Sequence, residues 1–165
     1  MDPGNVSEVL YYFVRLGRWN SKYKSAVEKI EHSENLFIEH TPLLSLMKSD
    51  FNERLSQEFS FEDATLQDIR TPFHEAELLM TNAINLIENA KHTQSLLQNL
   101  LKLSMLSFEG NCETVLRETN DCMELFEKKA SSIGEIASRF ENAVNEIQER
   151  LLASTETCNA TDSIE

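Results

Sequence analysis

Apolar residues recur every seven positions through the C-terminal third of the chain. One heptad position holds Cys112, Thr119, Phe126, Ile133, Phe140 and Ile147. A second holds Val115, Cys122, Ile136 and Ala143, and a third set comprises Leu116, Met123, Ala130, Ala137, Val144 and Leu151. This spacing keeps one broad apolar face along an α-helix, of the width found in helical bundles. It predicts a long helix over about residues 111–153.

A second long helix is predicted over about residues 72–109. Thr71-Pro72 suits its start, because threonine caps free backbone N–H groups and proline fits the first helical position. Its apolar stripe contains Phe73, Ala76, Leu79, Met80, Ala83, Leu86, Ile87, Ala90, Leu97, Leu100 and Leu101. Gly110 suits a C-terminal cap, and Gly110-Asn111 is short enough to fold this helix and the next into an antiparallel hairpin.

The N-terminal segment predicts a narrower coiled-coil seam over about residues 5–40. The heptad a positions are Val6, Phe13, Asn20 and Val27, and the d positions are Val9, Leu16, Tyr23, Ile30 and Phe37. Asn20 is the one polar residue in the first four a positions. A buried asparagine there can set the register of a coiled coil, whereas the alternative is a polar residue tolerated near solvent. Both interpretations stay open at this point.

A break is expected at Thr41-Pro42, with a shorter helix over residues 42–59. Its apolar face is formed by Leu43, Leu44, Leu46, Met47, Phe51 and Leu55. Ser60 to Asp63 resembles a capping-box start of a short helix or turn that ends near Arg70. The polar segment 154–165 lacks periodicity and is expected to be a disordered tail. The predicted fold is all-α: an elongated helical bundle or coiled coil in one domain over residues 1–153, with three long helices and a shorter helical connection.

Composition supports this fold and narrows the partners. The chain of 165 residues contains only 4 glycines and 3 prolines, which leaves little material for sheets and frequent turns. Its net charge of −13 disfavours binding to nucleic acid or to an anionic membrane, since both require clustered cations. The first thirty residues differ, with Arg15, Arg18, Lys22, Lys24 and Lys29 against three carboxylates. This basic stretch can pair with the protein's own acidic helices or steer an acidic partner.

No pattern of catalytic residues stands out. The phosphate-binding glycine loops, the GxSxG elbow and the HExxH zinc motif are absent from the sequence. No glutamate has a histidine three residues later, as a di-metal bundle site needs, and the three cysteines show no metal-binding spacing. We therefore expect no enzyme activity, no metal and no cofactor. No stretch is apolar enough to span a membrane and no secretion signal is evident, which predicts a cytoplasmic or nuclear protein.

Two threonines precede prolines, at Thr41 and Thr71, and form minimal targets for proline-directed phosphorylation. A phosphate at a helix N-terminus would be stabilised by the helix dipole. Helix capping alone also explains both residues, and the structural interpretation is favoured.

The candidate partner interface lies in the first predicted helix. It comprises Val9, Leu10, Tyr11, Tyr12, Phe13, Leu16, Trp19, Asn20 and Tyr23. The run from Val9 to Val14 is apolar all round the helix, so it must be covered on more than one side. Either the chain's own bundle covers it, or these aromatic residues dock a partner beside Arg15 and Arg18. A helix lying on a membrane is a third, less favoured interpretation.

Two functions follow from these patterns. The first is a non-catalytic adaptor or scaffold subunit, whose helices pair with other helical or coiled-coil proteins in a hetero-complex, as in vesicle-tethering, organelle-positioning or kinetochore assemblies. The second is a self-contained three- or four-helix regulatory bundle that binds a peptide or helix in a groove. The two differ in whether the apolar stripes are covered by this chain or by a partner.

Overall fold

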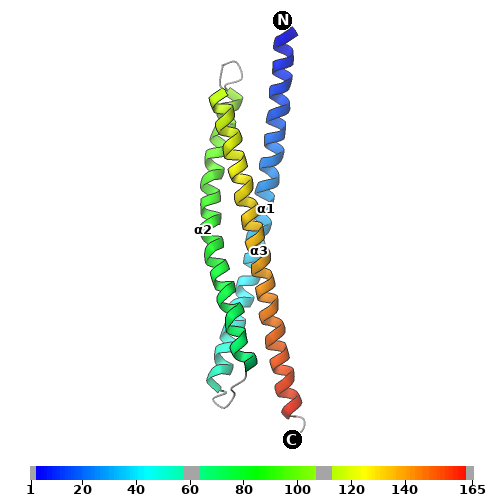
Figure 1. The fold of residues 1–165 in the computed structure, drawn as a ribbon, viewed down its shortest axis with the longest axis vertical. Helices are drawn as coiled ribbons and strands as arrows, with labels where there is room; N and C mark the ends of the chain where they lie inside the picture. Colours follow the sequence, from blue (N-terminus) through cyan, green and yellow to red (C-terminus); the bar gives the residue numbers. More distant parts are fainter. Residues whose placement is uncertain (1–2, 58–63, 107–112, 163–165) are drawn as a thin grey trace. The chain divides into compact units, whose positions relative to one another are not determined.

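The protein is all-helical, with three helices packed against each other. The computed structural model describes residues 3–57, 64–106 and 113–162, which form α1 (Pro3–Gln57), α2 (Ala64–Leu106) and α3 (Glu113–Asp162) (Figure 1). Side chains are described for residue 11 and residues 14–56, 68–104 and 113–153. The described part of the chain contains no strand, which confirms the predicted all-α class. The predicted turns at Ser60 to Asp63 and Gly110-Asn111 lie outside the described residues.

The predicted break at Thr41-Pro42 is wrong, because α1 is one continuous helix across it. The Thr41 hydroxyl does not cap a new helix but donates back to the Phe37 carbonyl oxygen, at 2.6 Å. A proline inside a helix costs about 3 kcal/mol. Leu44 and Met47, in the next turn, are both buried, and each contributes about 1.5–3 kcal/mol. Packing of the following turn therefore outweighs the proline.

The same correction applies to α2, which begins at Ala64 and continues through Thr71-Pro72. Pro72 is itself buried, between the core residues Ile69 and Phe73. Residues on both sides of the proline thus belong to one core. If the helix began at Pro72, Ile69 would not be part of the helix that packs into this core. The predicted separate helix ending near Arg70 is instead the first part of α2.

The predicted disordered tail is also wrong over residues 154–162, which continue α3 as far as Asp162. Leu151 is buried and holds the preceding turn, and residues 154–162 contain no glycine or proline that would end the helix. Polarity alone therefore does not terminate α3.

The three helices build two compact units. Unit 1 contains Met1–His32 and Asn85–Gly134, and unit 2 contains Ser33–Ile84 and Glu135–Glu165. Each helix thus contributes one segment to each unit. In unit 1 the buried core consists of Trp19, Ala26, Ile30, Ala90, Leu97, Met123, Phe126, Ala130 and Ile133. In unit 2 it consists of Leu44, Met47, Phe51, Ile69, Phe73, Ala76, Leu79, Phe140, Ala143, Val144, Ile147 and Leu151.

Contacts within each unit give the helix directions. In unit 2, α1 and α2 are antiparallel, because residue numbers rise along one helix as they fall along the other. The contacts are Thr41 with Met80, Lys48 with Glu77 and Phe51 with Phe73. The α2 and α3 helices are also antiparallel, because Asp68 pairs with Arg150 and Glu75 with Arg139 in unit 2, and Ser104 with Thr119 and Asn89 with Lys129 in unit 1. The predicted antiparallel pairing of the last two helices is therefore confirmed.

The heptads of α3 are confirmed, whereas one seam of α1 is displaced by one residue. Thr119, Phe126, Ile133, Phe140 and Ile147 are all fully buried. In α1 the predicted d residue Ile30 is buried, but the neighbouring seam runs through Trp19 and Ala26 instead of Asn20 and Val27. Asn20 is exposed, so the interpretation of a buried register-setting asparagine within this chain is wrong. The polar residue near solvent is what the structure shows.

Candidate helix-binding surfaces

The residues of the predicted interface, in the N-terminal part of α1, fall into four groups. Tyr11 is 68% exposed, and Asn20 is also exposed. Leu16 and Tyr23 are half-buried against the core of unit 1, while Trp19 is only 3% exposed and belongs to that core. The side chains of Val9, Leu10, Tyr12 and Phe13 lie outside the described residues. The structure therefore places Trp19 inside the chain's own core, and not on its free surface.

Trp19 and Tyr23 are both engaged inside unit 1. The Arg15 guanidinium carbon lies 5.1 Å from the centroid of the Trp19 ring, a cation–π arrangement. The Tyr23 ring stacks on Phe126 with 5.8 Å between centroids. Its hydroxyl oxygen accepts hydrogen bonds from the side-chain amides of Gln94, at 3.0 Å, and Gln98, at 2.7 Å. These contacts hold α1 against α2 and α3 in unit 1.

Three half-exposed leucines in unit 1 were missed by the sequence analysis. Leu96 and Leu103 of α2 are 49% and 48% exposed, and Leu125 of α3 is 48% exposed. A usable signal was present, because Leu96 and Leu103 are seven residues apart. It was hidden by the adjacent leucines of the core stripe, Leu97 and Leu101, which dominate that part of α2.

Helical periodicity, taken with the polar contacts between α2 and α3, indicates that these leucines lie beside the line where the two helices meet. The Lys129 ammonium donates to Asn89 Oδ1 and to Thr93 Oγ1, each at 2.7 Å. Asn89 is seven residues before Leu96 and so shares its side of α2, while Leu125 is one turn before Lys129 on α3. We refer to Leu96, Leu103 and Leu125 as the leucine face. It is a candidate surface for a further helix.

Cys122 lies near the leucine face, on the side of α3 that meets α2. Its thiol contacts the Thr93 carbonyl oxygen, at 3.8 Å. Burial raises the pKa of the Cys122 thiol, and the Lys129 ammonium offsets part of that rise. A thiol with a raised pKa is a weaker nucleophile at neutral pH, which fits a packing residue better than a reactive one.

Unit 1 also contains a cleft between α1 and α3 with a volume of about 270 Å³. Ala26 and Ala130, both buried, form its floor. Lys22 and Glu127 lie on opposite sides of it, with 3.8 Å between Nζ and Oε1. The small side chains on the floor leave space that neither helix fills.

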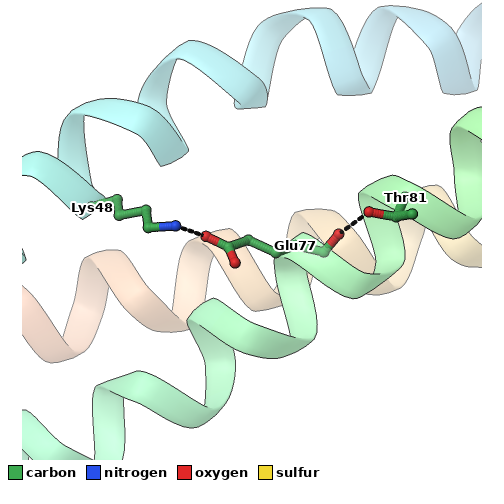
Figure 2. A network of polar contacts seen from close by, with 3 residues as sticks. All are labelled: Lys48, Glu77 and Thr81. Atoms are coloured by element: carbon green, nitrogen blue, oxygen red, sulfur yellow. Dashed lines mark hydrogen bonds and ion pairs between the residues drawn. The ribbon is translucent and has the colours of Figure 1, made fainter.

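Unit 2 contains a second cleft, of about 280 Å³, between α1 and α2. Phe51, Leu55 and Phe73 form its apolar part. At its edge the Lys48 ammonium pairs with the Glu77 carboxylate, and the Thr81 hydroxyl donates to the Glu77 carbonyl oxygen at 3.0 Å (Figure 2). The ion pair joins α1 to α2 on an exposed edge, where such pairs contribute about 0–1 kcal/mol.

The two Thr-Pro threonines do not lie at helix starts. Thr41 is half-buried in α1, and its hydroxyl also contacts Met80 Sδ, at 3.7 Å. Thr71 is exposed within α2. The favourable helix dipole invoked for a phosphate is therefore missing at both residues. Phosphorylation at either position stays a prediction without that support.

Within the described residues, no three His, Cys, Asp or Glu side chains gather closely enough to hold a metal ion. None of the described helices combines the length and apolarity needed to cross a bilayer.

No protein-family model, curated protein or solved structure matches the chain. The fold itself defines the class: an all-helical protein of three mutually packed helices.

Proposed function

We propose that this chain is a non-catalytic adaptor or scaffold subunit that associates with helices of other proteins in a hetero-complex. The observation that carries the proposal is the leucine face, where Leu96, Leu103 and Leu125 stay about half exposed beside a complete core. Leu96 and Leu103 have the heptad spacing of a seam that meets another helix. We propose further that the association is of the coiled-coil type and that the chain is an elongated unit of the assembly.

The leucine face can contribute useful binding energy. Fully burying a leucine contributes about 1.5–3 kcal/mol, so covering the exposed half of three contributes about 3 kcal/mol in total. The three leucines can therefore form the centre of a small interface, and a stable complex needs further contacts around them. Vesicle-tethering, organelle-positioning and kinetochore complexes are the kinds of assembly that use such subunits, in the cytoplasm or nucleus.

The test compares the native chain with a Leu96→Gln, Leu103→Gln, Leu125→Gln variant in affinity purification with mass spectrometry. Glutamine keeps helix propensity while removing the apolar surface. We expect helical subunits in stoichiometric amounts with the native chain and at least about tenfold less with the variant. The matched control is Leu152→Gln, an exposed leucine of unit 2. Recovery of the native chain alone, or equal recovery with the triple variant, would contradict the proposal.

A second candidate function is a self-contained regulatory bundle that binds a peptide or helix in a groove. The cleft of unit 2 favours it, because an apolar lining that includes the partly buried Leu55 lies beside the cations Lys48 and Arg70. Sedimentation and thermal melting of the purified chain separate the two functions. A compact monomer with one cooperative melt supports the bundle, whereas aggregation relieved only by a partner supports the subunit.

A further inference from the structure

The flank of α1 next to α3 in unit 1 carries a second heptad pattern, which is basic instead of apolar. Tyr11, Arg18 and Ser25 are spaced by seven residues, and so are Arg15, Lys22 and Lys29. Interleaved, these six residues follow the spacing of four and three that places side chains along one side of a helix. We call them the basic flank. They lie beside the core seam of Trp19 and Ala26, on the side where Lys22 reaches Glu127 of α3.

We propose that the basic flank binds an acidic amphipathic helix of a partner protein. The inference rests on the proposed function, and it adds the chemistry of one partner. Four of the six residues are cationic, in a chain whose net charge is −13. The cleft along the flank is lined by one carboxylate, that of Glu127. The basic flank therefore gives a negatively charged helix a complementary surface, whereas the acidic remainder of the chain repels that helix.

The cleft supplies a place for an apolar side chain of the partner. Its floor is Ala26 and Ala130, and Ser25 and Ser131 stand at its rim. Small residues at these positions let a partner's helix approach α1 and α3 closely. Tyr11, which is 68% exposed, offers a large amphipathic side chain at the N-terminal end of the same flank. The surface thus combines charge, a recess and an aromatic anchor.

The pattern specifies the occupant. From Arg15 to Lys29 the flank extends about 21 Å, at about 1.5 Å per residue. A helix of about fifteen residues, with carboxylates recurring every three or four positions and one medium-sized apolar residue between them, matches its length and its period. Nucleic acid or an anionic membrane would reach beyond one helix flank into the acidic remainder of the chain, where repulsion opposes binding.

The existing ion pair does not block such a partner. Lys22 and Glu127 are both substantially exposed and 3.8 Å apart, so their pairing contributes about 0–1 kcal/mol. A partner carboxylate can take the place of Glu127 at little cost. Arg18 lies on the same flank, is exposed, and forms no ion pair with another residue whose side chain the structure describes. Lys22 and Arg18 are therefore the cations most accessible to a partner.

The experiment measures binding of a synthetic helical peptide to the full chain by fluorescence anisotropy. The peptide is about fifteen residues long, stapled as a helix, with glutamates at the spacing above and one central leucine; a second peptide replaces every glutamate by glutamine. We expect the glutamate peptide to bind. Its affinity should fall markedly when the salt concentration is raised from about 50 to 200 mM. Binding should fall at least about tenfold in the Arg18→Glu, Lys22→Glu, Lys29→Glu variant.

The matched control reverses three exposed lysines of unit 1 that lie off the flank, as Lys91→Glu, Lys102→Glu, Lys128→Glu. Its net charge equals that of the flank variant, so equal losses in both would show general electrostatics and overturn the inference. Absence of binding by the native chain, or equal binding of the glutamine peptide, would overturn it too. Circular dichroism checks that both variants are folded.

Two further measurements separate this inference from the proposed function. Co-sedimentation with phosphatidylserine vesicles, and anisotropy with a single-stranded oligonucleotide, test the other anions; flank-dependent binding of either would overturn the acidic-helix assignment. If partners are lost with the leucine-face variant but retained with the flank variant, and the peptide does not bind, the inference falls while the proposed function stands. If the leucine-face variant keeps its partners while the flank variant loses one, and the peptide binds through the flank, the leucine-face proposal falls instead.

Discussion

Ser104 Oγ lies 3.0 Å from Thr119 Oγ1, and both hydroxyls are fully buried between α2 and α3. Thr119 Oγ1 also donates to the Val115 carbonyl oxygen, at 2.7 Å. Its proton is therefore used, and Ser104 is the donor between the two side chains. The pair is satisfied only when α2 and α3 are in this register, so it selects one alignment of two apolar stripes that could otherwise slide.

Replacing Thr119 by valine should lower the free energy of unfolding by about 1–3 kcal/mol, because the buried Ser104 hydroxyl loses its acceptor. Ser104→Ala should cost only about 1 kcal/mol, since Thr119 keeps its bond to Val115. The double variant should be less destabilised than the sum of the two. Urea unfolding of the four proteins measures the coupling; strictly additive effects would show that the pair does not act together.

Two adjacent residues of α1 should differ strongly in how much their truncation destabilises the chain. Trp19→Ala should cost about 3–5 kcal/mol, because the ring fills the core of unit 1. Asn20→Ala should change stability by less than about 0.5 kcal/mol, because its side chain is exposed. Thermal melting of both variants compares them directly. A stable Trp19→Ala protein that loses only its partners would instead assign Trp19 to an external interface.

Pro42→Ala should stabilise the chain by as much as about 3 kcal/mol, because alanine restores the backbone N–H at an exposed position inside the continuous α1. Pro72→Ala should stabilise it less, since Pro72 is buried and the smaller side chain leaves a void. Denaturant midpoints give the comparison. A destabilised Pro42→Ala protein would indicate that α1 does break there.

Cys122 should react slowly with iodoacetamide at neutral pH compared with the unfolded chain, because burial raises the pKa of its thiol. Since the folded pKa is the higher one, folding disfavours the thiolate. Stability should therefore decline as the pH rises through the unfolded pKa, and the loss should level off above the folded one. Lys129→Met should slow alkylation further by removing the charge that lowers this pKa.

The measurement uses a Cys112→Ser, Cys158→Ser background, so that a single thiol is followed. Gln148→Met, a substitution on exposed surface of unit 2, serves as a matched control for the lysine variant. Faster alkylation in the Lys129→Met protein would mean that loss of its bonds to Asn89 and Thr93 opens the site, contrary to the electrostatic expectation.

Periodicity was the most informative property of the sequence. The core residues of α3, such as Phe126 and Phe140, were predictable because a seven-residue repeat reports the buried side of a helix directly. The helix ends near Thr41 and Thr71 were not predictable in this way. Threonine and proline carry a local preference of a few kcal/mol, whereas the packing that overrides it, at Met47 or Ile69, depends on residues far away in the chain.

The candidate surfaces were harder to predict than the core. Trp19 could have been internal or external, because an aromatic residue on an apolar helix suits either, and only the fold shows which neighbours cover it. The basic flank was visible as a cluster of cations near the N-terminus. The spacing of these cations by three and four already places them along one side of α1. That this side borders the Ala26–Ala130 cleft required the position of α3.

The way each unit is assembled from separate stretches of sequence has a practical consequence for genetics and biochemistry. Unit 1 needs Met1–His32 together with Asn85–Gly134, so a contiguous fragment that contains all of unit 1 also contains residues 33–84, which are only part of unit 2. Deletion mapping, in which the chain is shortened stepwise until a partner is lost, would remove part of a core with almost every cut and report misfolding as lost binding. Point substitutions on exposed side chains are the appropriate tool for locating binding sites on this chain.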